Sequence, residues 1–197
     1  MRILLLCLFS YFLGNISGSL LIGKVLYNKD IREYGSGNAG MTNALRTFGK
    51  KIGAATFIID FIKGMIAAYI GSRVMGDFGI MLAGIFVVLG HDWPVVFRFK
   101  GGKGIATSFG VLVMSQPIIA FIMFVIFLIT VIISKYVSLG SVLAAAAGLV
   151  IGAYFFLTAQ IYLSAMLLVL GLMTIYKHRQ NIWRLLIGEE NKIHINI

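Results

Sequence analysis

The segment "PIIAFIMFVIFLITVIIS", residues 117–134, consists almost entirely of apolar side chains and carries no charge. A run of about 18 apolar residues is long enough to cross the hydrocarbon core of a bilayer as one α-helix. The rest of the chain fits such an environment, since 59% of its 197 residues are hydrophobic, 12% are charged, and the mean hydropathy is +0.96. Average soluble domains contain about 25% charged residues. We therefore predict an all-α integral membrane protein with a single domain over residues 1–197.

Apolar runs on both sides of this segment predict further membrane spans. The run at the amino terminus resembles a signal peptide, but only Arg2 precedes it and it continues to Lys24, which favours a retained span. The run at 104–114 covers only about 16 Å, and "SQP" at 115–117 is either a break between two spans or a kink in one helix. Together with 117–134, the predicted spans are 3–23, 52–74, 78–96, 104–114, 139–157 and 160–176.

The positions of the basic residues favour the break. With seven spans, 14 of the 17 basic residues fall on one side of the membrane, whereas one helix over 104–134 would move Lys135 and the basic tail to the other side. Positively charged loops face the cytoplasm. We therefore predict a seven-transmembrane-helix bundle with its N-terminus outside and its C-terminus in the cytoplasm. The 14 residues are Lys24, Lys29, Arg32, Arg46, Lys50, Lys51, Arg98, Lys100, Lys103, Lys135, Lys177, Arg179, Arg184 and Lys192.

One predicted cytoplasmic loop contains "GSGNAGMTN", residues 35–43. Its glycines match the spacing G-x-G-x-x-G, but the dinucleotide fingerprint also requires a preceding strand and a βαβ unit, which this chain lacks. Glycine leaves backbone N–H groups open and allows a concave nest that suits an anion. The alternative is a flexible loop at the membrane surface. Further donors to an anion in this segment are Ser36, Asn38, Thr42, Asn43 and Arg46.

A second glycine-rich loop lies in "FRFKGGKGIATSFG", residues 97–110. It lacks the spacing of a Walker loop, so we exclude a nucleoside triphosphatase. Gly101, Gly102 and Gly104 leave N–H groups open beside Lys103, and a predicted helix begins at about this point, which favours anion binding. The alternative is a basic anchor at the cytoplasmic surface.

Two later segments carry polar side chains at helix ends. In "SKYVSLGS", 134–141, the hydroxyl of Ser141 either caps the following helix or contacts a ligand. In "YKHRQNIWRLL", 176–186, His178 could act as a base or a phosphate donor, and Asn181 shares its face if the helix continues. The tail also fits an amphipathic helix at the membrane interface.

Charged residues also occur within or next to the predicted spans. Asp60 and Lys63 are spaced i, i+3, and we expect a structural ion pair because single charges in a membrane are costly. His91 and Asp92, in "GHDWP", either cap the third span or brace the neighbouring glycine loop. We expect no metal site, because His91, His178 and His194 are not spaced as paired ligands.

Taken together, "GSGNAGMTN", "FKGGKGIATSFG", "SKYVSLGS" and "YKHRQNIWRLL" resemble, in this order, the bacterial acyl-phosphate:glycerol-3-phosphate acyltransferases. The resemblance implies transfer of a fatty acyl group from acyl phosphate to the 1-hydroxyl of glycerol 3-phosphate, which gives lysophosphatidic acid and inorganic phosphate. It implies no cofactor, a location in the bacterial plasma membrane with the active site facing the cytoplasm, and a soluble phosphate acyltransferase as the partner that supplies acyl phosphate.

The resemblance also implies roles for individual residues. The catalytic residues would be Lys103, Ser36, Arg46, His178 and Asn181. The substrate-binding residues would be Asn38, Thr42, Asn43, Gly101, Gly102, Gly104, Thr107 and Ser141.

Two alternative functions stay open at this point. A transporter for a phosphorylated metabolite would share the short helices and helix-end anion sites, although its polar groups would lie near the membrane midplane. A lipid-binding scaffold would explain the basic tail but not the glycine loops. Nucleic acid is the weakest candidate partner for the net charge of +10, because most of the chain lies in lipid.

Overall fold

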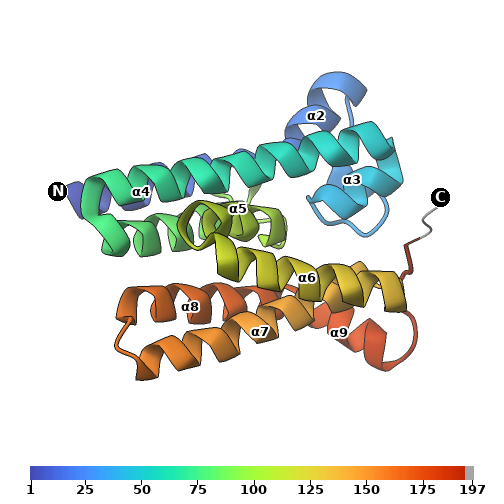
Figure 1. Ribbon diagram of the computed structural model, residues 1–197. Coiled ribbons are helices and arrows are strands. Elements are labelled where there is room, and N and C mark those ends of the chain that lie inside the picture. The colour runs from blue at the N-terminus through green and yellow to red at the C-terminus, as the bar shows by residue number, and fades with distance from the viewer. Residues whose placement is uncertain (194–197) are drawn as a thin grey trace. The chain divides into compact units, whose positions relative to one another are not determined.

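The computed structural model describes residues 1–193. Within this range every regular element is a helix, and the chain divides into two compact units, residues 1–115 and the part that begins at Gln116 (Figure 1). The elements of the first unit are α1 Arg2–Gly14, α2 Gly18–Tyr27, η1 Ile31–Glu33, α3 Met41–Phe48, α4 Lys50–Asp92, η2 Val95–Phe97 and α5 Ile105–Ser115. Those of the second are α6 Pro117–Ser134, α7 Val137–Leu157, α8 Ile161–Lys177 and α9 Arg179–Leu186.

The helix α4 reverses direction near its middle (Figure 1). Met75 and Gly76 leave the helical conformation, and Gly76 has a φ of 58°, which is the left-handed region that glycine tolerates best. The two arms then pack closely, because a Cβ atom on Gly71 would lie 2.4 Å from the carbonyl oxygen of Gly79. These arms correspond to the predicted spans 52–74 and 78–96. The second arm ends at Asp92 rather than at 96, because Pro94 cannot continue a helix.

The first predicted span, 3–23, is broken into α1 and α2, whose axes differ in direction by 44°. In the first unit α1 and α5 both pack against α4, which forms the centre of the unit. Small residues permit this packing: a Cβ atom on Gly110 of α5 would lie 2.0 Å from the carbonyl oxygen of Phe61. In the second unit α7 packs against both α6 and α8, and α9 bends away from α8 by 56°.

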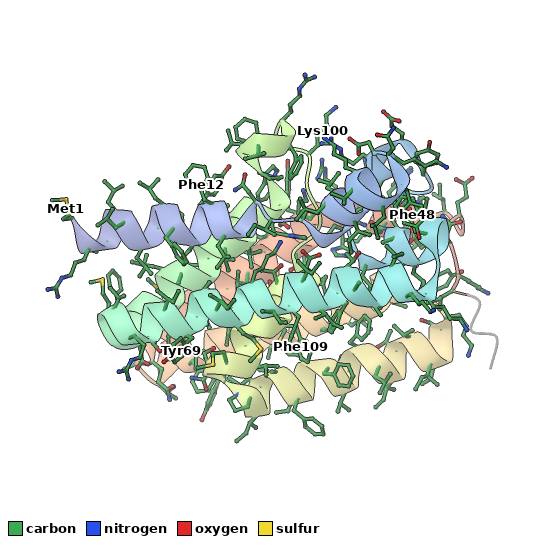
Figure 2. All side chains as sticks on the ribbon, turned by 90° about the horizontal axis from the view of Figure 1, so that it is seen from above. Met1, Phe12, Phe48, Tyr69, Lys100 and Phe109 are labelled. Carbon is green, nitrogen blue, oxygen red and sulfur yellow. The ribbon has the colours of Figure 1, made fainter. Side chains whose placement is uncertain are left out.

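Large apolar side chains on the outer surface suit contact with lipid. Phe12 is 54% exposed and Tyr69 is 53% exposed, and both project outward from the first unit (Figure 2). Among the described residues, three helical segments are long and apolar enough to cross a membrane, namely 50–97, α6 and α7, and the bent pairs α1–α2 and α8–α9 raise this number to five. The all-α architecture is confirmed for residues 1–193, whereas the count of seven spans and the orientation of the termini stay predictions.

Candidate functional site

One buried amide organises the loop that precedes α3. The Nδ2 group of Asn43 donates to the carbonyl oxygens of Ile31 at 3.1 Å and Tyr34 at 2.9 Å, and its Oδ1 accepts from the backbone N–H of Ser36 at 2.9 Å. Gly35 lies against this amide with a φ of 58°, and a Cβ atom there would come 2.3 Å from Oδ1. Asn43 is 1% exposed and its amide is occupied by the loop backbone. The structure therefore gives Asn43 a bracing role that the sequence did not reveal.

The other predicted residues of this loop lie nearer the surface. Ser36 and Arg46 are exposed, and Asn38 and Thr42 are half-buried. Arg46 lies in the last turn of α3, one turn beyond the buried Asn43. The loop thus combines a fixed backbone with polar and cationic side chains that solvent can reach.

The second glycine loop, residues 98–104, packs directly on His91 at the end of α4. The N–H of Gly102 donates to the carbonyl oxygen of His91 at 3.1 Å. A Cβ atom on Gly101 would lie 2.0 Å from that oxygen, and one on Gly102 would lie 2.1 Å from Nε2 of the His91 ring. The same Cβ position is 2.9 Å from the carbonyl oxygen of Ala39, so the two glycine loops meet beside His91.

The residues that follow lead into α5. Lys103 is half-buried, Gly104 is buried with a φ of 71°, and the carbonyl oxygen of Gly104 accepts the N–H of Ser108 at 2.7 Å. Thr107 is fully buried within the first unit, and its hydroxyl has no hydrogen-bond partner among residues 1–193. Lys103 therefore stands where the glycine loop meets the start of a helix.

Arg32 ties the two loops together. Its guanidinium forms an ion pair with Asp30 at 2.6 Å and donates to the carbonyl oxygens of Phe97 at 2.8 Å and Lys100 at 3.2 Å. The hydrogen bond from Arg32 lowers the pKa of the Asp30 carboxyl below its usual value. The sequence did not single out Arg32, because its partners on the second loop are backbone atoms more than sixty positions away.

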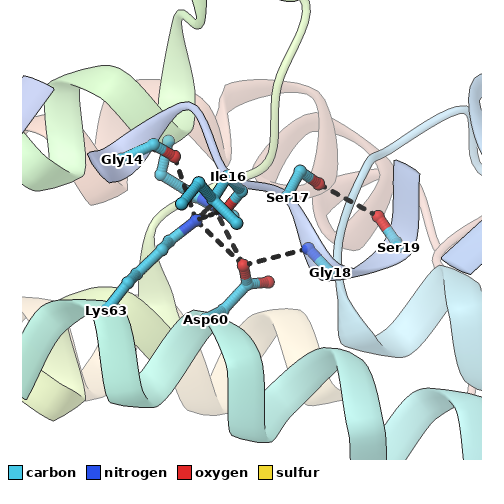
Figure 3. A network of polar contacts seen from close by, with 8 residues as sticks. Gly14, Ile16, Ser17, Gly18, Ser19, Asp60 and Lys63 are labelled. Atoms are coloured by element: carbon cyan, nitrogen blue, oxygen red, sulfur yellow. Dashed lines mark hydrogen bonds and ion pairs between the residues drawn. The ribbon is translucent and has the colours of Figure 1, made fainter. Parts of the chain in front are cut away.

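A buried charge cluster connects His91 to the segment between α1 and α2, and Figure 3 shows its Asp60 and Lys63 with that segment. The predicted ion pair is present, with Lys63 Nζ 2.9 Å from Asp60 Oδ1 and both side chains at least 97% buried. Lys63 also donates to the carbonyl oxygens of Gly14 and Ile16, where α1 ends, and lies 2.8 Å from Nδ1 of His91. Of the two roles predicted for His91, the structure supports the brace for the glycine loop.

In the second unit the carboxylate of Glu190 accepts hydrogen bonds from several polar side chains. Its carboxylate accepts from Ser138 Oγ at 3.0 Å, Asn181 Nδ2 at 2.8 Å and Arg184 Nε at 2.8 Å. Burial raises the pKa of Glu190, but the hydrogen bonds from Arg184, Asn181 and Ser138 outweigh it, so this pKa lies below its usual value. Sequence analysis missed Glu190, although it is an acidic residue directly after a strongly basic tail segment.

The remaining predicted residues of this unit are buried. His178 is 3% exposed, and its Nδ1 lies 2.8 Å from the carbonyl oxygen of Thr174, so Nδ1 carries the proton of the neutral ring. The hydroxyl of Ser141 donates to the carbonyl oxygen of Val137 at 2.9 Å within α7. His194 lies outside the described residues, and the expectation of no metal site stays a prediction.

The comparisons with known proteins agree with one another. The family model described as glycerol-3-phosphate acyltransferase matches residues 4–188. A glycerol-3-phosphate acyltransferase of Finegoldia magna is 48% identical over 98% of each chain, and one of Bacillus subtilis is 40% identical over the same shares. A crystal structure of PlsY (YgiH), an integral membrane glycerol 3-phosphate acyltransferase, in its glycerol 3-phosphate form, is 38% identical with a TM-score of 0.90. The match covers 98% of this chain and 96% of that one.

Proposed function

The chain belongs to the glycerol-3-phosphate acyltransferase family, and from this premise we propose that it takes its acyl group from acyl phosphate and transfers it to the 1-hydroxyl of glycerol 3-phosphate. In this reaction the hydroxyl oxygen forms a bond with the acyl carbon. The bond between that carbon and the phosphate oxygen breaks, the hydroxyl loses its proton, and inorganic phosphate leaves. The product is lysophosphatidic acid.

The chemistry of acyl phosphate matches what the described residues offer. Acyl phosphate is a mixed anhydride whose phosphate is already a good leaving group, so no protein nucleophile is required. Catalysis then depends on positioning both substrates and neutralising negative charge. Cationic side chains and open backbone N–H groups supply both of these needs.

The observation that carries the proposal is the meeting of the two glycine loops at Gly102 and Ala39, with Lys103 as the next residue. Lys103 and the N–H groups of Gly101 and Gly104 would hold the phosphate group and stabilise the charge that develops on it, while Gly102, whose N–H donates to His91, would allow the loop to approach the ligand closely. Ser36 and Arg46 would contribute from the first loop, with Asn38 and Thr42 beside them. Thr107 is retained as a binding residue because its buried hydroxyl lacks a partner among the described residues.

Residues of the second unit keep their proposed roles in the same reaction. His178 and Asn181 would act on glycerol 3-phosphate, with Ser141 as a binding residue. Nδ1 of His178 donates to the carbonyl oxygen of Thr174. In the neutral ring Nε2 is then the acceptor, and it can receive a hydrogen bond from the hydroxyl of glycerol 3-phosphate. Asn43 stays proposed as a binding residue, and its amide also supports the loop backbone.

The membrane setting completes the proposal. The two arms of α4, the separate helices α5 and α6, and the bent pair α1–α2 support seven spans rather than six. Together with the excess of positive charge on one side, this supports an active site facing the cytoplasm of a bacterial cell. There the soluble phosphate acyltransferase would deliver acyl phosphate.

The donor can be tested directly with purified protein in detergent. Glycerol 3-phosphate is supplied with acyl phosphate, acyl-CoA or acyl carrier protein carrying the same labelled chain, and labelled lysophosphatidic acid is measured. We expect product from acyl phosphate alone, with one inorganic phosphate released for each acyl group transferred. Equal product from acyl-CoA would contradict the proposed donor.

The role of Lys103 can be separated from a general effect of positive charge. Lys103→Ala should reduce kcat/KM by about a hundredfold or more, because it removes a charged contact to the phosphate. Lys100→Ala is the matched control, since Lys100 lies in the same loop with its side chain exposed and projecting away from the helices (Figure 2). Near-normal activity of Lys103→Ala would overturn the assignment.

A further inference from the structure

The buried cluster of Asp60, Lys63 and His91 makes contacts that a simple ion pair does not need. An ammonium group accepts no hydrogen bond, and a charged Lys63 shares its three protons among Asp60 Oδ1, the carbonyl oxygens of Gly14 and Ile16, and Nδ1 of His91 at 2.8 Å, which makes Nδ1 an acceptor. The proton of the neutral imidazole therefore lies on Nε2. Asp60 Oδ1 is 2.9 Å from Lys63 Nζ and 3.6 Å from the same ring nitrogen, which fixes the ammonium beside His91.

The opposite edge of the His91 ring faces both glycine loops. Its Nε2 occupies the space that a side chain on Gly102 would need, and the carbonyl oxygen of Ala39 borders the same position. The backbone of His91 also accepts the N–H of Gly102 at 3.1 Å. A rotation or displacement of this ring would therefore change the separation between the two loops.

Lys63 connects this ring to the break in the first span. Its ammonium binds the carbonyl oxygens of Gly14 and Ile16, which lie between α1 and α2 (Figure 3). Asp60 accepts the N–H of Gly18 at the start of α2 from the other side of the break, at 3.5 Å. The cluster thus holds three pieces of backbone: the break, the end of α4 and the second glycine loop.

The geometry points to Asp60, Lys63 and His91 as positioning residues that hold the two glycine loops at the separation a phosphate dianion requires. This inference rests on the proposed function and deepens it. The ligand class is the phosphate group itself, which glycerol 3-phosphate and acyl phosphate share. The cluster does not contact the substrate but acts through Gly102 and the loop around it.

The test compares His91→Phe, which keeps a ring of similar size without nitrogen atoms, with His91→Gln, which keeps an N–H donor and an acceptor. KM and kcat are measured in detergent while glycerol 3-phosphate and acyl phosphate are varied in turn. For at least one substrate we expect His91→Phe to raise KM by about tenfold, because a displaced loop loses a charge-assisted hydrogen bond to the phosphate, and about 1.4 kcal/mol of lost binding is a factor of ten. His91→Gln should recover most of the loss. The substrate whose KM rises identifies the phosphate group that the loops hold.

Thermal unfolding of each variant separates positioning from folding. An unchanged KM for both substrates in folded His91→Phe would overturn the inference, and so would a loss in kcat alone that His91→Gln does not restore. If His91→Phe does not fold, Gly102→Ala replaces it, since the added Cβ must displace the ring or the loop. Gly102→Ala should raise KM, and an unchanged KM would overturn the inference. Its matched control is Gly148→Ala, whose Cβ would meet only the flexible end of Met123.

Wild-type protein and Lys103→Ala are assayed in parallel. If the wild type forms no lysophosphatidic acid from acyl phosphate, the proposed function fails, and with it the premise of the inference. If the wild type is active, Lys103→Ala is inactive and His91→Phe has a normal KM, the proposed function stands and the positioning role alone is rejected.

Discussion

A single side chain, Asn43, determines the conformation of the first glycine loop. Its amide uses all three of its described hydrogen bonds on the backbone of residues 31–36, so the loop depends on one buried group. A glycine-rich loop without such a support would lose considerable conformational entropy when it orders around a ligand. The amide thereby keeps Ser36 in place before any substrate arrives.

Replacing this amide should weaken both the fold and substrate binding. Asn43→Ala leaves the N–H of Ser36 without its acceptor and removes one of two donors from the carbonyl oxygens of Ile31 and Tyr34, and each net hydrogen bond lost costs about 0.5–1.5 kcal/mol. We expect a lower free energy of unfolding in detergent and a higher KM for glycerol 3-phosphate. Gln180→Ala removes an exposed amide and should change stability by less than about 0.5 kcal/mol. Equal stability of the two variants would contradict the bracing role.

At the scale of residues, the sequence indicated which segments suit an anion, but it did not indicate which side chains support other parts of the fold. Glycine loops beside Arg46 and Lys103 indicated anion binding, because that property depends on local composition. Asn43 supports the first glycine loop and Glu190 accepts hydrogen bonds from three side chains. Both roles depend on partners that only the fold brings near. Asn43 binds carbonyl groups up to 12 positions away, and Glu190 binds Ser138 from 52 positions away.

Among the elements, the first span shows how a buried charge changes a helix. An apolar run from 3 to 23 predicts one continuous helix, yet α1 ends at Gly14 and α2 begins at Gly18. The carbonyl groups freed at the break are satisfied by Lys63, which is the condition for non-helical backbone within a bundle. Hydropathy averaged over the whole run hides such a break, because the polar segment "GNISGS", residues 14–19, is short and lies between two long apolar stretches.

Lys63 and Asp60 carry opposite charges at this break, so removal of one charge should destabilise the protein more than removal of both. Lys63→Met leaves Asp60 as a buried carboxylate without its cation, which should cost about 3–5 kcal/mol. Adding Asp60→Asn removes the lone charge, so the double variant should be more stable than Lys63→Met alone. The free energy of unfolding in mixed micelles gives this comparison. A double variant whose loss equals the sum of the two single losses would show that the two groups do not interact.

The helix α9 depends on an acidic residue that follows it. Glu190 holds Asn181 and Arg184 of α9 to Ser138 of α7. Because its pKa is lower in the folded protein than in the unfolded chain, the carboxylate stabilises the fold above the unfolded pKa of about 4.3. That contribution is lost as the pH falls through the lower, folded value.

Hydrogen exchange of residues 179–190, corrected for the intrinsic effect of pH, measures this contribution. Protection in the wild type should be constant near neutrality and decline below about pH 4.3. Glu190→Gln should show weaker protection near neutrality and little further change with pH. Glu189→Gln, at an exposed neighbour, should behave as the wild type. A wild-type profile that matches Glu190→Gln at all pH values would contradict the role of the carboxylate.

For the whole molecule, bilayer thickness made the apolar segments predictable, and this accounts for the agreement between predicted spans and the observed positions of α6, α7 and α8. The short amphipathic helix α3 was missed inside the first loop, because eight residues with few large apolar groups give little signal. Sidedness rests on a different property of the sequence, the placement of basic residues. The decisive position is Gln116, where α5 ends and α6 begins.

Labelling of single cysteines tests sidedness at this position. The background is Cys7→Ala, which removes the only cysteine of the chain. Seven spans place Gln116→Cys outside, so a membrane-impermeant maleimide should label it in intact cells, as it should label Asp77→Cys between the arms of α4. Lys135→Cys lies in a basic connection and should react only after the membrane is opened, because positive charge is retained on the cytoplasmic side. Six spans would bury Gln116 in lipid and expose Lys135 outside, so the opposite pattern of labelling would exclude the seven-span arrangement and the cytoplasmic active site together.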